Sequence, residues 1–163
     1  MMSSETDQFL KFRPNTKYIE EVKHLPNTNY ETSKCENMSA IEAEKSLGSV
    51  AEGWLVGDMN SSTSWYCNIK RKSVIATPII RHTWNINNNG IHYDTVDYRQ
   101  SNKFNNFQYV MDLNIDKFYI INDEKFYPRV LFLSDTNLMI QKKDGIRHTI
   151  TKEEHERFYN EVK

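Results

Sequence analysis

Hydrophobic and polar residues alternate along most of the chain after residue 48, and a period of two predicts β-strands. The alternating or β-rich segments are residues 50–56, 65–69, 73–87, 107–113, 117–122, 126–133, 138–142 and 146–150. Several connections between them are very short, which indicates antiparallel neighbours. The predicted fold class is therefore mainly β, an antiparallel up-and-down meander of about eight strands. Because an open meander exposes two strand edges, we expect a closed or nearly closed barrel.

Two capping boxes predict a helix on either side of these strands. Ser39 and Glu42 have the spacing in which a hydroxyl and a carboxylate cap the first turn of a helix. They predict a short helix before the first strand. Thr151 and Glu154 repeat the spacing and predict a C-terminal helix over residues 152–162.

The first 36 residues are polar and irregular, and we interpret them as an N-terminal arm ahead of a single domain at residues 37–163. Within the arm, Thr16–Leu25 predicts one short helix that ends before Pro26. Two placements of the arm stay open at this point. It either packs on the domain or extends away from it.

The dipeptide Asn89-Gly90 stands between two alternating segments, which predicts a β-hairpin with a two-residue type I′ turn. That turn places four cross-strand pairs on one face of the hairpin, namely Ile80–Arg99, His82–Asp97, Trp84–Thr95 and Ile86–Tyr93. Because this face has more apolar area than the other, we expect it to point inward.

The predicted inward face also holds His82, Asp97 and Arg99, and polar groups that are buried need partners, water or a ligand. Three interpretations stay open. His82 and Asp97 form a structural pair near a rim, or His82 and Arg99 hold the polar end of a ligand. The third is catalysis, in which Asp97 orients His82 as a general base. It is disfavoured because no nucleophile, metal trio or second carboxylate can be placed beside His82.

The order of a short helix, a Gly-Trp strand entry, a long meander and a final helix resembles the lipocalin-like (calycin) barrels over about residues 45–150. The stretch "SVAEGWLVGD" is similar to their first-strand Gly-X-Trp region, "DTVDYR" to their Thr-Asp-Tyr motif, and "FYPRVLFLSDTNLMIQKKDG" to the closing strands of small bacterial members. Two departures are plain: Gly53 and Trp54 are adjacent, and Val96 interrupts the second motif. The resemblance implies a barrel that Trp54 closes at the bottom and whose interior binds a small apolar or amphipathic molecule.

Composition narrows the function classes further. A formal net charge of -1 gives no basic field that would attract nucleic acid or an anionic membrane. Cys35 and Cys67 either pair or remain thiols, and their spacing decides neither. The histidines are too scattered for a zinc site, and Asp112 and Asp116 flank a turn, so we expect no metal and no cofactor. Without a transmembrane run or a signal-peptide pattern, the sequence predicts a cytoplasmic protein, with a trimmed exported protein left open.

The leading function hypothesis is a non-catalytic protein that binds a small apolar or amphipathic ligand inside the barrel. Its predicted ligand-binding residues are His82, Trp84, Tyr93, Asp97, Arg99, Trp54, Tyr109 and Phe132. The alternative is a viral or bacterial accessory module that binds a protein partner through residues 1–36 or a sheet edge. A small enzyme that uses His82 and Asp97 is the third hypothesis.

Overall fold

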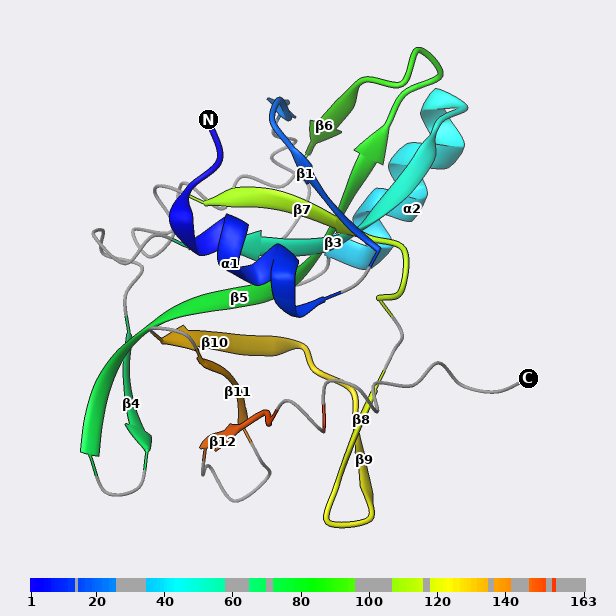
Figure 1. Cartoon of the computed structure of the whole chain (residues 1–163). Coiled ribbons are helices and arrows are strands. Elements are labelled where there is room, and N and C mark those ends of the chain that lie inside the picture. Colours follow the sequence, from blue (N-terminus) through cyan, green and yellow to red (C-terminus); the bar gives the residue numbers. More distant parts are fainter. Residues whose placement is uncertain are drawn as a thin grey trace.

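The computed structural model (Figure 1) describes residues 1–13, 15–25, 35–57, 65–69, 72–95, 107–115, 118–134, 137–141, 147–151 and 154. The helices are α1 (Ser4–Phe12) and α2 (Cys35–Ser46). The strands are β1 (Thr16–Ile19), β2 (Lys23–His24), β3 (Ser49–Val56), β4 (Trp65–Ile69), β5 (Lys72–Ile86), β6 (His92–Asp94), β7 (Gln108–Asp112), β8 (Tyr119–Ile121), β9 (Glu124–Phe126), β10 (Val130–Ser134), β11 (Asn137–Gln141) and β12 (Arg147–Thr149).

The main sheet follows the path β1-β7-β3-β5-β10-β11-β12, with β4 and β6 paired to β5, and β2 paired to β6. Every pairing is antiparallel except that between β2 and β6, so the mainly β, antiparallel prediction is confirmed. The predicted meander is wrong, because β3 lies between β5 and β7 and β5 also pairs with β10. Among the described strands, β1 and β12 end the path without pairing to each other, so this sheet does not close into a barrel.

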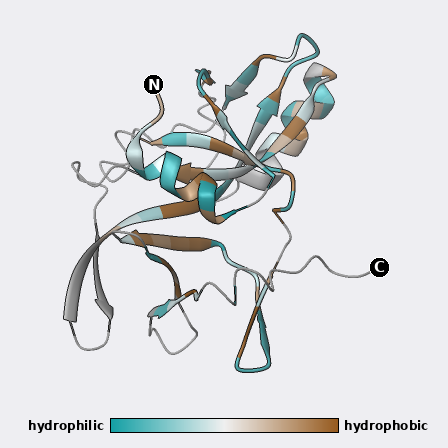
Figure 2. Cartoon of the chain, viewed as in Figure 1, coloured by the Kyte–Doolittle hydropathy of each residue, from teal (hydrophilic) through white to brown (hydrophobic). Residues whose placement is uncertain are grey.

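The sheet buries apolar side chains on both faces. Figure 2 shows the hydrophobic colour concentrated along β10 and the middle of β5, while the tips of the β5–β6 and β8–β9 hairpins are hydrophilic. Trp54 and Val56 of β3 belong to one large core cluster, which also contains Phe9 of α1. Leu55, between them in the strand, belongs to a second cluster with Tyr109 on the opposite face. This second face carries the candidate site.

The N-terminal segment forms a helix and two strands of the domain, so the helix predicted over Thr16–Leu25 is wrong. α1 begins after Ser3, whose side-chain oxygen accepts a hydrogen bond from the Thr6 N–H at 3.1 Å. Phe9 is fully buried, and its ring meets Trp54 edge-on with centroids 6.0 Å apart. β1 pairs with β7 and β2 with β6. Partners this distant in sequence override local helix propensity, and they hold the segment on the domain.

A buried ion pair fixes the end of α1 to the sheet. Arg13 Nη2 lies 2.7 Å from Asp112 Oδ2, and both side chains are fully buried. The same carboxylate oxygen accepts a hydrogen bond from Trp54 Nε1 at 2.8 Å. The Arg13 guanidinium also stacks over the Trp54 ring, 5.0 Å from its centroid. Asp112, which the sequence places beside a turn, is therefore a core residue.

Tyr119 lies against this ion pair, and its ionisation provides a test of the packing. Burial raises the pKa of the Tyr119 phenol above its ordinary 10.0, and the Asp112 carboxylate adds to that rise, while Arg13 opposes it. The unfolded chain then loses this proton before the folded chain does. The corresponding stability is present below about pH 10 and is lost as the pH rises through the folded pKa.

We therefore expect wild-type protein to lose stability more steeply than Tyr119→Phe in urea denaturation between about pH 9 and pH 11. The two curves are compared as the difference in unfolding free energy at each pH, which cancels the contribution of the other tyrosines. A constant difference across this range contradicts a buried, neutral Tyr119.

The hairpin after β5 has a different turn from the one predicted. The Asn87 N–H donates to the Ile91 carbonyl at 2.9 Å, and the Gly90 N–H donates to the Asn87 carbonyl at 3.0 Å. Of the loop residues 88–90, only Gly90 has a positive φ, at 78°, which is the pattern of a three-residue loop and not of a type I′ turn. The extra loop residue shifts the register by one, so that Tyr93 faces Asn85 and not Ile86.

The second predicted capping box is confirmed. The Thr151 N–H donates to Glu154 Oε2 at 2.8 Å, and the Glu154 N–H donates to Thr151 Oγ1 at 3.2 Å. The remainder of the helix predicted over residues 152–162 lies outside the described residues.

Candidate functional site

A pocket of about 170 Å³ opens where the N-terminal segment crosses from one strand to another. β1 pairs with β7 as far as Ile19, opposite Tyr109, and then leaves it. The chain reaches β6 at β2, where His24 pairs with Asp94 and the Leu25 N–H donates to the Asp94 carbonyl at 2.9 Å. The gap between these two attachments is the pocket. Its lining residues are Tyr18, Ile19, Glu20, Val22, His24, Phe107, Gln108 and Tyr109.

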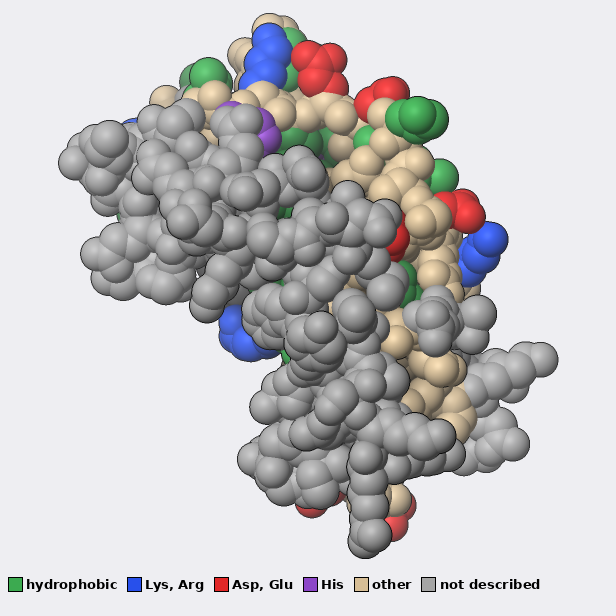
Figure 3. All heavy atoms as spheres, turned by 90° about the vertical axis from the view of Figure 1, so that its left-hand side faces the viewer, with side chains coloured by type: hydrophobic (Ala, Val, Ile, Leu, Met, Phe, Trp, Pro, Cys, Tyr) green, Lys and Arg blue, Asp and Glu red, His purple; other side chains and the backbone are tan. Residues whose placement is uncertain are grey.

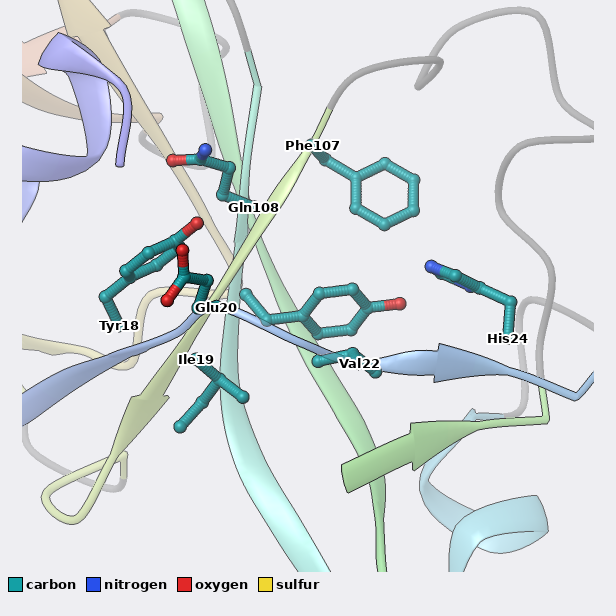
Figure 4. A pocket seen from close by; sticks show the side chains of 8 residues that line it. Tyr18, Ile19, Glu20, Val22, His24, Phe107 and Gln108 are labelled. Atoms are coloured by element: carbon teal, nitrogen blue, oxygen red, sulfur yellow. The ribbon is translucent and has the colours of Figure 1, made fainter. Parts of the chain in front are cut away.

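Four of the eight residues that line the pocket carry an aromatic ring. The rings of Phe107 and Tyr109 meet edge-on with centroids 5.5 Å apart, and the His24 ring lies 6.3 Å from Phe107 and 6.0 Å from Tyr109. Figure 4 shows Phe107, His24 and Val22 on one side, with Tyr18, Glu20 and Gln108 on the other. The wall is therefore apolar and aromatic on one side and more polar on the other.

Behind the pocket, Tyr109 belongs to a buried polar network. Its hydroxyl donates to Asp94 Oδ2 at 2.6 Å, and His82 Nε2 donates to the same oxygen at 2.6 Å. Asp94 and His82 are at most 1% exposed. Because a carboxylate only accepts, Nε2 of His82 carries the proton in this arrangement. Two charge-assisted hydrogen bonds thus compensate the burial of Asp94 and fix the Tyr109 ring.

Trp84 covers this network from the β5 side. Its ring lies 5.0 Å from that of Tyr109 and stacks with His82 at 6.2 Å. Its Nε1 donates to His92 Nδ1 at 2.9 Å, so His92 acts as a neutral acceptor. Burial lowers the pKa of His92 below its ordinary 6.5, and the charge of Lys17 lowers it further, which is consistent with that neutral form.

The structure brings together three of the predicted site residues, His82, Trp84 and Tyr109. The predicted partner of His82 was Asp97, but the observed carboxylate is that of Asp94. The one-residue register shift explains the change, because it moves Asp94 to the face of the hairpin that carries His82. Asp97 and Arg99 themselves lie outside the described residues.

Tyr93 points to the opposite face of the hairpin, which is covered by α2. Its hydroxyl donates to Glu42 Oε1 at 3.2 Å, and its cross-strand neighbour Asn85 donates through Nδ2 to the Ser39 carbonyl at 2.8 Å. The helix starts at Cys35, one turn before the predicted cap, so Ser39 lies inside it against the sheet. Tyr93 is therefore a helix contact and does not share a site with His82.

Trp54 and Phe132, also predicted to bind the ligand, lie in two further core clusters. Trp54 faces α1 and the buried Asp112. Phe132 of β10 packs with Ala76 and Met139 in a separate cluster. A barrel interior would have joined these side chains with Trp84, but in the open sheet they belong to different faces and regions.

The site residues that the sequence interpretation missed are Tyr18, Glu20, His24, Asp94 and Phe107. The sequence signal for Asp94 was Gly90, because Gly at the third loop position is typical of a three-residue hairpin loop. A loop of that length places Asp94 on the face of the hairpin that carries His82. No local signal points to the other four. They meet only because β1 pairs with β7 across most of the chain.

Within the described residues, no group of three or more His, Cys, Asp or Glu side chains is placed to hold a metal ion. The same residues include no helix with the length and apolarity needed to cross a membrane. The coloured part of the face in Figure 3 carries basic and acidic side chains interspersed, without a patch of one sign. The side chains of Cys35 and Cys67, whose pairing the sequence left open, lie outside the described part.

Comparisons with protein-family models, with curated proteins and with solved structures find no match to this chain.

Proposed function

We propose that this protein binds a small amphipathic molecule in the pocket between the β1–β2 segment and β7. The observation that carries the proposal is the position of Tyr109, whose ring lines the pocket while its hydroxyl is fixed by buried Asp94. A wall held in this way keeps its shape without a ligand, so binding requires little ordering of side chains. The proposal keeps the ligand class expected from the sequence and replaces a barrel interior with an open-sheet pocket.

The size of the pocket limits the ligand. A cavity of about 150 Å³ accommodates benzene, and this pocket has about 170 Å³. The ligand group that enters is therefore a single ring or a compact branched group, and any longer part extends into solvent. The rings of Phe107 and Tyr109 offer apolar contact, while Glu20 and Gln108 offer polar contact at the other side.

The two other hypotheses have less support in this geometry. The form of the protein-partner hypothesis that uses residues 1–36 requires a free arm, whereas Phe9 and Arg13 are buried in the domain. The form that uses a sheet edge keeps β1 and β12, which end the described path of the sheet. Catalysis by His82 requires contact with a substrate, and the His82 side chain is fully buried behind Tyr109.

The test is a screen of single-ring and branched small molecules by ¹H–¹⁵N NMR on the full chain. We expect hits to shift the amide signals of Phe107, Tyr109 and His24. Val22→Phe adds a ring inside the pocket and should abolish these shifts. The control Ile120→Phe adds the same ring at an exposed position on the β8–β9 hairpin, away from the pocket, and should leave these shifts unchanged.

Two results would overturn the proposal. One is a set of hits whose shifts lie away from the pocket, and the other is binding that persists unchanged in Val22→Phe. Circular dichroism and melting temperature of both variants verify that each is folded, so that loss of binding is not loss of structure.

A further inference from the structure

We infer that the group held in this pocket is a small organic cation, such as a methylated ammonium. The inference rests on the proposed function and adds the charge of the ligand. Three features of the lining residues support it: the number of aromatic rings, the presence of a carboxylate, and the hydrogen bonds in which the donors of Tyr109 and Gln108 are already used.

The first supporting feature is the set of aromatic residues around the pocket. Tyr18, His24, Phe107 and Tyr109 all line the pocket, and they come from both sides of it. The face of an aromatic ring carries negative charge, so a cation that reaches the faces of these rings is attracted by them. A neutral apolar group gains contact area from the same rings but no electrostatic attraction.

The second supporting feature is the carboxylate of Glu20. Glu20 is the only acidic or permanently charged residue among the eight that line the pocket. Its Oε1 lies 3.6 Å from the Met1 amino group, and both groups are largely exposed, so a ligand cation would take the place of that ammonium beside the carboxylate. Lys17 and Lys23, on the same segment, are not among the lining residues. Among the lining side chains the charge is therefore negative, and it attracts a cation that displaces the Met1 ammonium.

The third supporting feature is that the Tyr109 hydroxyl and the Gln108 amide already have hydrogen-bond partners. The Tyr109 hydroxyl uses its proton on Asp94, which leaves its oxygen as an acceptor. The Gln108 amide donates to the Met1 carbonyl at 2.8 Å, and its oxygen accepts from Thr6 at 2.7 Å. An anionic ligand needs donors, whereas the donors of Tyr109 and Gln108 are already paired. The second carboxylate, Asp94, also lies directly behind the ring of Tyr109.

A pair of probes with the same shape and different charge tests the inference. Choline carries a trimethylammonium group, and 3,3-dimethylbutan-1-ol is its uncharged counterpart. We expect choline to bind about tenfold more tightly in calorimetric or NMR titrations at pH 8. We also expect this preference to decrease as the salt concentration rises.

Three variants separate the contributions. Glu20→Gln removes the carboxylate charge at constant shape and should weaken choline binding several-fold while leaving the neutral probe unaffected. Glu21→Gln changes the adjacent exposed acid, which does not line the pocket, and should leave both affinities unchanged. Phe107→Leu removes one ring face and should lower choline affinity by about threefold.

Equal affinity for the two probes, or no effect of Glu20→Gln, would overturn the cation inference and leave the binding proposal intact. If neither probe binds while neutral rings from the screen do, the cation inference is wrong as well. Failure of the whole screen to produce pocket shifts would overturn the proposed function itself.

Discussion

Gly53→Ala is expected to destabilise the domain by more than about 3 kcal/mol or to prevent its folding. A Cβ at this position would overlap the Val110 carbonyl oxygen and lie 2.9 Å from both the Met111 Cα and the Trp84 ring. Relief by a backbone shift is costly, because Gly53 lies in β3 between β5 and β7 and is paired on both sides. Urea denaturation followed by circular dichroism measures the loss.

Gly90→Ala provides the matched control for this prediction. Gly90 has a φ of 78°, and a Cβ there would meet nothing within 4 Å. The substitution therefore introduces only backbone strain, which costs about 1 kcal/mol. If Gly53→Ala costs no more than Gly90→Ala, then β7 and Trp84 do not approach β3 as closely as described. Since Trp84 packs on Tyr109, the candidate site would then need a different geometry.

The strands could be predicted from the sequence, but their partners could not. Alternation located β4 (Trp65–Ile69) and β5 (Lys72–Ile86) to within a residue or two. The period of two reports which face of a strand is apolar, and it carries no information about which strand lies beside it. Short connections suggested sequential pairing, whereas β3 pairs with β7 and β5 pairs with β10. The predicted barrel followed from that assumption.

The length of the hairpin loop at residues 88–90 determines which carboxylate lies beside His82, and this length was not evident from the sequence. The face that contains His82 and Trp84 was identified correctly as buried, and a carboxylate partner for His82 was expected. A two-residue loop at Asn89-Gly90 predicts Asp97 as that carboxylate and puts Asp94 on the other face. A loop of three residues, with the left-handed position only at Gly90, gives the observed register.

A type I′ turn does occur in the chain, at Asn122–Asp123. Both residues have positive φ, at 51° and 63°, and they join β8 to β9 through the pairing of Ile121 with Glu124. Asn and Asp tolerate this conformation because their short polar side chains bond locally. Asn-Asp is a weaker signal than Asn-Gly, which explains why the sequence interpretation placed the type I′ turn at the wrong hairpin.

Asp112→Asn is expected to cost about 3 to 5 kcal/mol, because it leaves the Arg13 guanidinium charged and buried without its counter-ion. Both side chains are fully buried, and Asp112 also accepts from Trp54 Nε1. The Asn side chain still offers an oxygen acceptor to Trp54 Nε1. The loss of unfolding free energy therefore reports the uncompensated charge of Arg13. Urea denaturation measures the total, and hydrogen exchange at Phe9 measures whether α1 detaches first.

Two comparisons test the physical reason. Asp7→Asn breaks the exposed pair with Lys11, whose side chain is 74% exposed, and should cost at most about 0.5 kcal/mol. Arg13→Met combined with Asp112→Asn removes the stranded charge as well and should be more stable than Asp112→Asn alone. If the double variant is instead the less stable of the two, Arg13 contributes mainly through its contact with Trp54, and α1 is held by packing and not by the ion pair.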